Sequence, residues 1–141
     1  MTAAGIDPEV LRRLEDLLHV FGRVPRAQVL DALKSTDFTN LMRSPEQRYA
    51  RAGFPTKVVE SLSNSTPVIC NLTSDLGRYL RDGENSLLVE DCTPEALARV
   101  LAKAVALTQE QRAAMQARAL ASAEADFLDT GYLDVLDGLC R

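Results

Sequence analysis

The residues with the clearest chemical potential lie in one short segment, from Gly53 to Glu60. Gly53 permits a turn or a close backbone approach, and Pro55 presets the backbone angle for the start of a helix. A helix that begins here directs free backbone N–H groups and the positive end of its dipole outward at Thr56 and Lys57. Such a helix start can hold a phosphate or the oxygens of a sugar.

Two side chains add to this candidate site. Lys57 supplies a positive charge for a phosphate, and Glu60 supplies a carboxylate that can accept hydrogen bonds from hydroxyl groups. Local chemistry alone leaves a second interpretation open, in which Pro55 and Thr56 only cap a helix and Glu60 is solvated. The segment 73–75, Thr-Ser-Asp, is likewise either a set of ligand donors or an ordinary helix cap.

A polar loop precedes this segment and carries Arg43, Arg48 and Arg51. It is interpreted either as a phosphate-facing loop or as a solvated surface loop. The sequence contains no nucleophile–base pair, no metal-ligand cluster and no glycine-rich phosphate motif of the Rossmann or Walker type. The lone histidine, His19, lies in an apolar stretch, so we predict a packed strand residue rather than a catalytic one.

Apolar periodicity predicts alternating helices and strands over the first 107 residues. The expected strands are 18–21, 37–42, 67–70 and 87–89, and the expected helices are 8–18, one from Pro25 with Val29, Leu30 and Leu33 on one face, one from Pro55, 74–80, 93–107, 108–123 and 131–139. This alternation is typical of a parallel sheet with helices on both faces. We therefore predict an α/β fold, with ligands beyond the carboxyl ends of the strands.

Length and charge limit the possible functions. The chain has 141 residues, which suits one domain, and its net charge of −4 argues against nucleic-acid binding. No apolar run is long enough to span a membrane, and the first residues lack the pattern of a secretion signal. Cys70, Cys92 and Cys140 share no metal-binding spacing, so we predict reduced thiols in a cytoplasmic protein.

In five blocks the sequence resembles the C-terminal half of family 4 glycosyltransferases of the GT-B fold. The blocks are 20–25, 37–39, 53–62, 66–69 and 79–85, and they follow in order within about residues 5–122. Each block alone is weak evidence for the resemblance, but five blocks in order and with compatible spacing are strong evidence. The resemblance implies transfer of a sugar from a UDP- or GDP-linked donor with retention of configuration. It implies no metal and no other cofactor.

The resemblance also implies roles for particular residues. The carboxylate of Glu60 contacts the ribose of the donor nucleotide, and the residues near the base are Arg23 and Val24. The turn and helix start contact the donor sugar and its phosphates through backbone amides; these residues are Gly53, Phe54, Pro55, Thr56 and Lys57. The possible further phosphate ligands are Arg43 and Arg51. No residue is assigned a catalytic role.

The sequence departs from the family pattern. Ala52 replaces a second glutamate of many members, and Ser65 and Ser86 replace glycines, where we expect positive φ angles at a cost of about 1 kcal/mol each. The first strand, its helix and the second strand of the family's domain are missing, with a basic pair that neutralises the diphosphate. In the family's sheet, the missing strands lie between strands 18–21 and 37–42. Without them, each of these two strands would have an open edge.

We therefore expect an incomplete Rossmann-like parallel sheet of about four strands in residues 1–122 and a helical tail in 123–141. Either the chain is part of a longer polypeptide, or its sheet is repaired by repacking or by pairing with another copy. The first functional hypothesis is the donor-binding portion of a retaining hexosyltransferase, inactive in isolation, whose partners are a nucleotide sugar and the missing acceptor domain or another copy. The alternative is a non-catalytic α/β remnant or partner-binding module.

Overall fold

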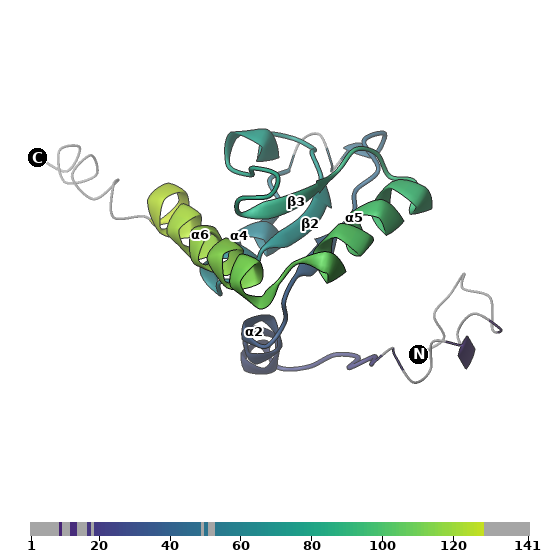
Figure 1. Cartoon of the computed structure of the whole chain (residues 1–141), viewed down its shortest axis with the longest axis horizontal. Helices are drawn as coiled ribbons and strands as arrows, with labels where there is room; N and C mark the ends of the chain where they lie inside the picture. The colour runs from purple at the N-terminus through teal and green to yellow at the C-terminus, as the bar shows by residue number, and fades with distance from the viewer. Residues whose placement is uncertain are drawn as a thin grey trace, which may run out of the picture.

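A computed structural model describes residues 9, 12, 13, 17, 19–48, 50 and 53–128 (Figure 1). Their regular elements are α2 (Arg26–Lys34), β1 (Thr39–Leu41), α4 (Thr56–Ser63), β2 (Val68–Asn71), the 3₁₀ helix η1 (Leu76–Arg78), β3 (Ser86–Val89), α5 (Pro94–Ala106) and α6 (Gln109–Phe127). The three strands form one parallel sheet in the order β1-β2-β3. The predicted α/β class, with an incomplete Rossmann-like sheet, is confirmed.

The central strand β2 is the most buried element. All four of its residues are buried, as expected for a short apolar run between two parallel neighbours. Its register places Val68 opposite Thr39 of β1 on one side and opposite Ser86 of β3 on the other. The Thr39 N–H donates to the Pro67 carbonyl at 3.1 Å, which fixes the start of the β1–β2 pairing.

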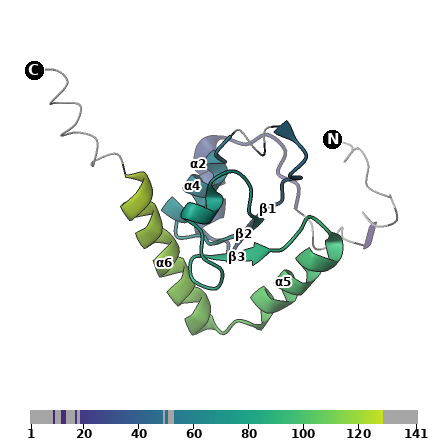
Figure 2. The same ribbon diagram turned by 90° about the horizontal axis from the view of Figure 1, so that it is seen from above.

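Helices cover both faces of the sheet (Figure 2). On one face α4 and α6 enclose a core that contains Val58, Leu62 and Cys70. The small side chains of Ala119 and Ala123 let α6 pack closely against α4 in this core. On the other face α5 packs on β2 and β3 through residues that include Ile69, Leu87 and Ala96.

The starts of α5 and α6 follow their capping residues. Thr93 Oγ1 accepts a hydrogen bond from Ala96 N–H at 3.2 Å, with a proline in the first turn. Thr108 and Gln111 form a reciprocal capping box at the start of α6. Both starts agree with the predicted helices 93–107 and 108–123, although α6 extends to Phe127, beyond the predicted end. None of the described helices combines the length and the apolarity needed to cross a membrane.

The prediction of a strand at 18–21 is wrong for its described part. His19–Phe21 form no strand, and Val20 and Phe21 are 72% and 75% exposed. His19 is exposed too, so it is not a packed strand residue. A segment with apolar side chains forms a strand only where a neighbouring strand pairs with its backbone. None of the described strands pairs with this segment.

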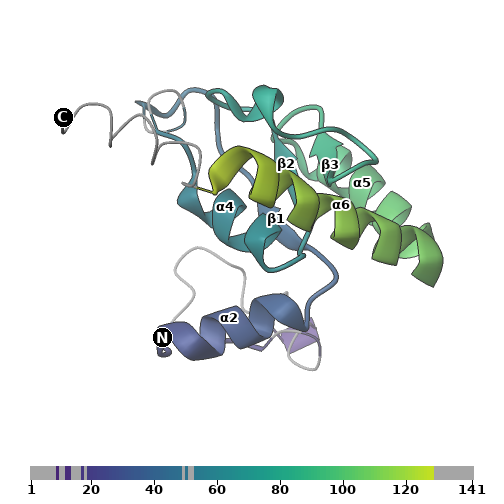
Figure 3. The same cartoon turned by 90° about the vertical axis from the view of Figure 1, so that its left-hand side faces the viewer.

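The helix predicted from Pro25 is present as α2, but its apolar face is not buried. None of its residues is buried, and Val29 is 41% exposed. Figure 3 shows α2 apart from the α4–α6 layer. Of the predicted helix 8–18, Glu9, Arg12 and Arg13 are helical, whereas Leu17 lies in a turn. Its other residues, like the predicted helix 131–139, lie outside the described residues.

The two serines that replace family glycines behave differently. Ser65 has a φ of 59°, as predicted, directly after the end of α4. Ser86 is not among the described residues with positive φ; it lies in β3, fully buried, and its hydroxyl donates to the Arg81 carbonyl at 3.0 Å. The expectation for Ser86 is wrong because this serine is part of the strand ladder rather than of the preceding turn.

Candidate functional site

The N-terminus of α4 lies at the carboxyl edge of the sheet, after the loop that leaves β1. Pro55 is the residue before the helix, and no side chain caps this end. Val58 N–H donates to the Pro55 carbonyl at 2.9 Å, but no described residue accepts from the N–H groups of Thr56 and Lys57. Both residues are exposed. The helix start therefore presents free donors and a positive dipole end to solvent.

The turn before α4 is fixed from two directions. The Phe54 ring packs in an aromatic cluster, 5.4 Å from the Tyr79 ring centroid and 5.6 Å from that of Phe127. Arg43 Nη1 donates to the Gly53 carbonyl at 3.1 Å. The Phe54 side chain thus anchors the turn in the aromatic cluster. Gly53 and Pro55, on either side of Phe54, form the backbone that leads to the start of α4.

Asn71, at the end of β2, holds the loop after β1. Its Oδ1 accepts from Arg43 N–H at 2.9 Å and its Nδ2 donates to the Arg43 carbonyl at 2.8 Å. Asn71 is buried, so this two-point contact lies in a low-dielectric setting. The structure thus gives Arg43 a positioning role between β1, β2 and the Gly53 turn. Arg51 and Ala52 lie outside the described residues.

Glu60 lies one turn into α4 and forms an ion pair with the start of α2. Its Oε1 is 3.6 Å from Arg26 Nη2, and the two side chains are 39% and 78% exposed. Arg23, exposed, and Val24, half-buried, lie in the loop that leads to Arg26. The structure therefore brings α2 next to the predicted ribose ligand. Sequence reasoning missed Arg26, although its place directly after the Gly22–Pro25 loop was a usable signal.

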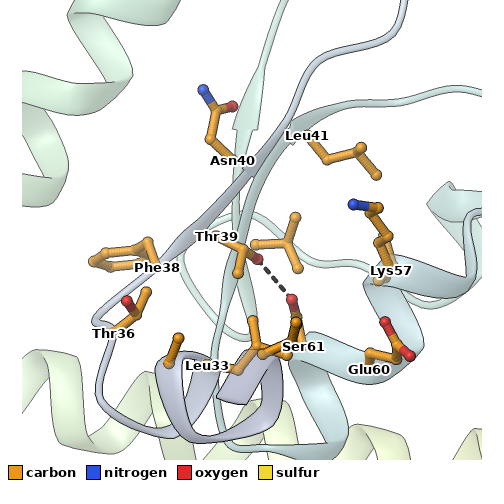
Figure 4. A pocket seen from close by; sticks show the side chains of 13 residues that line it. Leu33, Thr36, Phe38, Thr39, Asn40, Leu41, Lys57, Glu60 and Ser61 are labelled. Carbon is orange, nitrogen blue, oxygen red and sulfur yellow. Dashed lines mark hydrogen bonds between the residues drawn. The ribbon is translucent and has the colours of Figure 1, made fainter. Parts of the chain in front are cut away.

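An open hollow of about 360 Å³ separates α2 from β1 and α4 (Figure 4). Lys57 and Glu60 lie along its α4 side, and Leu33 and Phe38 lie on the side of α2 and β1. In its wall the hydroxyls of Thr39 and Ser61 are hydrogen-bonded at 2.8 Å. The hollow is mostly apolar, with the charged groups on one helix only.

The segment 73–75 does not cap η1 through its side chains. No side chain accepts at that helix start, and the Ser74 hydroxyl donates instead to Asp75 Oδ1 at 3.1 Å. Thr73 Oγ1 is buried and has no hydrogen-bond partner among the described residues. Ser74 has a φ of 53°, a conformation that L residues adopt at some cost.

Of the described cysteines, Cys70 is buried and Cys92 is exposed. Burial raises the pKa of the Cys70 thiol to about 12, so it is neutral at physiological pH and a poor nucleophile. The described part of the chain contains no group of three histidine, cysteine or acidic residues that could hold a metal ion.

Comparison with known proteins identifies the family. The model of the family described as glycosyl transferases group 1 matches residues 11–121, which include every described element from α2 to α5, most of α6, and the Gly53–Glu60 segment. No curated protein sequence matches the chain. The family match covers well over half of the 141 residues. The chain therefore belongs to the group 1 glycosyl transferases.

Proposed function

We propose that this chain binds the nucleotide-sugar donor of a retaining glycosyltransferase that transfers a hexose to a glycan or glycoconjugate acceptor. One observation carries the proposal: α4 begins at the carboxyl edge of a parallel sheet with free N–H groups at Thr56 and Lys57 and no side-chain cap. In open parallel sheets this edge is where ligands bind. The family match supports glycosyl transfer as the reaction.

The main chemical task in such a transfer is to stabilise the departing diphosphate. Negative charge grows on the phosphate oxygens as the bond to the sugar breaks. Backbone N–H groups and the α4 dipole can offset that charge without reorganisation, because the helix already holds them in place. The exposed Lys57 side chain adds a positive charge at the same end. The chain needs no metal for this step in the mechanism that we propose.

Glu60 is proposed to accept hydrogen bonds from the ribose hydroxyls. Its carboxylate is half-exposed and faces Arg26 across 3.6 Å, a separation that leaves the pair weak and easily rearranged. Arg23 and Val24 lie on the loop just before Arg26 and are proposed to lie near the base. We propose that the phosphates, the ribose and the base follow one another from the start of α4 towards the start of α2.

Completion of the transfer requires a unit that binds the acceptor. We propose that this unit is a further domain or another copy, and that the isolated chain shows little or no turnover. Cytoplasmic localisation is proposed on the same footing, because nucleotide sugars and reduced thiols are both expected there.

Two observations favour the alternative, a non-catalytic α/β module that keeps the fold without the activity. The described sheet has only three strands, with β1 at its edge, and Glu60 is engaged by Arg26. A partner-binding module of this kind would not respond to nucleotides, which makes the two candidates separable.

A thermal-shift titration with UDP and GDP tests the proposal. We expect one nucleotide to raise the melting temperature in a saturable manner. Glu60→Gln removes a charged hydrogen-bond acceptor and should weaken binding by about tenfold or more. Glu124→Gln, an exposed carboxylate on α6, is the matched control and should leave binding unchanged. Absence of any response at millimolar UDP and GDP would favour the non-catalytic module.

A further inference from the structure

The chain segments at the carboxyl ends of the three strands meet at Arg43. This residue lies just beyond the end of β1, and its N–H and carbonyl are held by Asn71, the last residue of β2, at 2.9 and 2.8 Å. The Cys92 thiol, in the loop between β3 and α5, donates to the same carbonyl at 3.1 Å. The backbone of Arg43 is therefore fixed from β2 and from the β3–α5 loop.

The Arg43 side chain extends from this fixed backbone to the turn before α4. Arg43 is half-buried, and its Nη1 donates to the Gly53 carbonyl at 3.1 Å. Because the donor is charged, such a hydrogen bond is stronger than one between two neutral groups. Arg43 thus links the carboxyl edge of the sheet to the Gly53 carbonyl.

Gly53 by itself leaves the orientation of the following peptide group poorly determined. A residue without a Cβ atom has access to a wide range of backbone angles, so the Gly53–Phe54 peptide can turn over at little steric cost. The hydrogen bond from Arg43 selects one orientation. The carbonyl of this peptide faces Arg43, and because the peptide is planar and trans, the Phe54 N–H points the opposite way.

The Phe54 N–H is a further backbone donor beside the start of α4. No described residue accepts a hydrogen bond from it, as is also the case for the N–H groups of Thr56 and Lys57. Pro55, which lies between them, has no N–H. All the backbone donors of residues 54–57 are therefore available, and neighbouring N–H groups of this kind can bind an anion together.

From these contacts we infer that Arg43 is a positioning residue of the proposed donor site. Its guanidinium holds the Gly53 carbonyl and thereby keeps the Phe54 N–H turned towards the donor's phosphates, beside the donors of Thr56 and Lys57. The inference rests on the proposed function. It gives Arg43 an action through the backbone of the turn, in place of the direct phosphate contact that the sequence suggested.

Preorganisation is the physical advantage of this contact. Without it, the Gly53–Phe54 peptide would be ordered only when the phosphate binds, at a cost in conformational entropy. The aromatic cluster fixes the Phe54 ring, and Arg43 fixes the peptide that precedes it. Together the two contacts hold the turn in one conformation before the ligand arrives.

NMR titration of the full-length Arg43→Met variant with UDP and GDP tests this inference. Methionine keeps much of the side-chain length but has no donor for Gly53, while the contacts of Asn71 remain because they use backbone atoms of residue 43. The affinity for the nucleotide should fall by about tenfold. At saturation, the shift of the Phe54 amide should be clearly smaller than in the unaltered chain, while the shifts of Thr56 and Lys57 are retained.

Arg48→Met is the matched control, because it makes the same change at an exposed arginine of the same loop. It should leave both the affinity and the Phe54 shift unchanged, and the Ile69 amide of the central strand reports whether each variant is folded.

Unchanged affinity in Arg43→Met would overturn the inference. Reduced affinity with a full Phe54 shift at saturation would also overturn it, since Arg43 would then contact the phosphate directly. A failure of the proposed function looks different: Thr56 and Lys57 would not respond to either nucleotide even in the unaltered chain, and the inference would fall with it.

Discussion

Two regions of this molecule differ sharply in how far their apolar side chains are buried. The packed region, which comprises β2, β3, α4, α5 and α6, contains most of the buried apolar side chains described. The open region, residues 19–41 with α2 and β1, contributes no fully buried apolar residue. Both regions have apolar residues at helical or strand spacing. The difference shows that regularly spaced apolar residues are buried only where a neighbouring helix or strand covers them.

The candidate site lies where the two regions meet. Its backbone donors belong to α4, whose inner face is anchored by Val58 and Leu62 in the packed region. The residues expected near the base, Arg23 and Val24, belong to the open region. The proposed phosphate contacts therefore lie on a helix that is anchored by packing, whereas the proposed base contacts lie in the open region.

The largest expected contrast is between Leu62, a core residue of α4, and Leu33, a half-buried residue of α2. Leu62→Ala removes a fully buried side chain between α4 and α6 and should lower the free energy of unfolding by about 2–5 kcal/mol. Leu33→Ala, on the half-buried face of α2, should cost about 1 kcal/mol or less. Urea unfolding followed by circular dichroism measures both. Equal losses would show that α2 is as well packed as α4.

A smaller contrast concerns the two serines at family glycine positions. Ser65→Gly relieves a left-handed backbone and should raise the free energy of unfolding by up to about 1 kcal/mol. Ser86→Gly should lower it, because the buried Ser86 hydroxyl loses its bond to Arg81 and the strand gains flexibility. The same urea experiment distinguishes them. Stabilisation by Ser86→Gly would contradict the strand assignment.

The smallest expected effect is a pH dependence in the packed region. Partial burial acts to raise the pKa of Asp82, but hydrogen bonds from Leu88 N–H and Lys103 outweigh it, so the pKa lies below its usual value. The ionised form is thus favoured in the folded state. Ionised Asp82 therefore stabilises the fold at pH values above the pKa that it has in the unfolded chain. This stabilisation is lost as the pH falls through the lower pKa that it has in the folded protein.

The Asp82→Asn variant should therefore lose less stability than the unaltered chain on acidification. The difference should be less than about 1 kcal/mol, because the Asp82–Lys103 pair is exposed. Asp31→Asn, an exposed carboxylate on α2, is the control and should leave the profile unchanged. Thermal unfolding between about pH 5 and pH 2 provides the measurement. A steeper acid loss in Asp82→Asn would contradict the pairing of β3 with α5 through this carboxylate.

Much of the fold could be predicted from the sequence because its signals were local. Thr93 with Pro94 and Thr108 with Gln111 mark the starts of α5 and α6, and the short apolar run of β2 marks a buried strand. The segment 18–21 misled the prediction, because its apolar residues are exposed in the structure and strand formation depends on a partner. The contacts of Asn71 with Arg43 and of Arg26 with Glu60 join distant segments, which spacing alone does not reveal.

The central claim is that the start of α4 binds the phosphates of a donor nucleotide. NMR titration of the uniformly ¹⁵N-labelled chain with UDP and GDP tests it most directly. We predict saturable shifts of the Thr56 and Lys57 amides, with smaller shifts around Glu60, while amides of α5 on the opposite face stay unchanged. Unchanged Thr56 and Lys57 amides at millimolar concentrations of both nucleotides would contradict the claim.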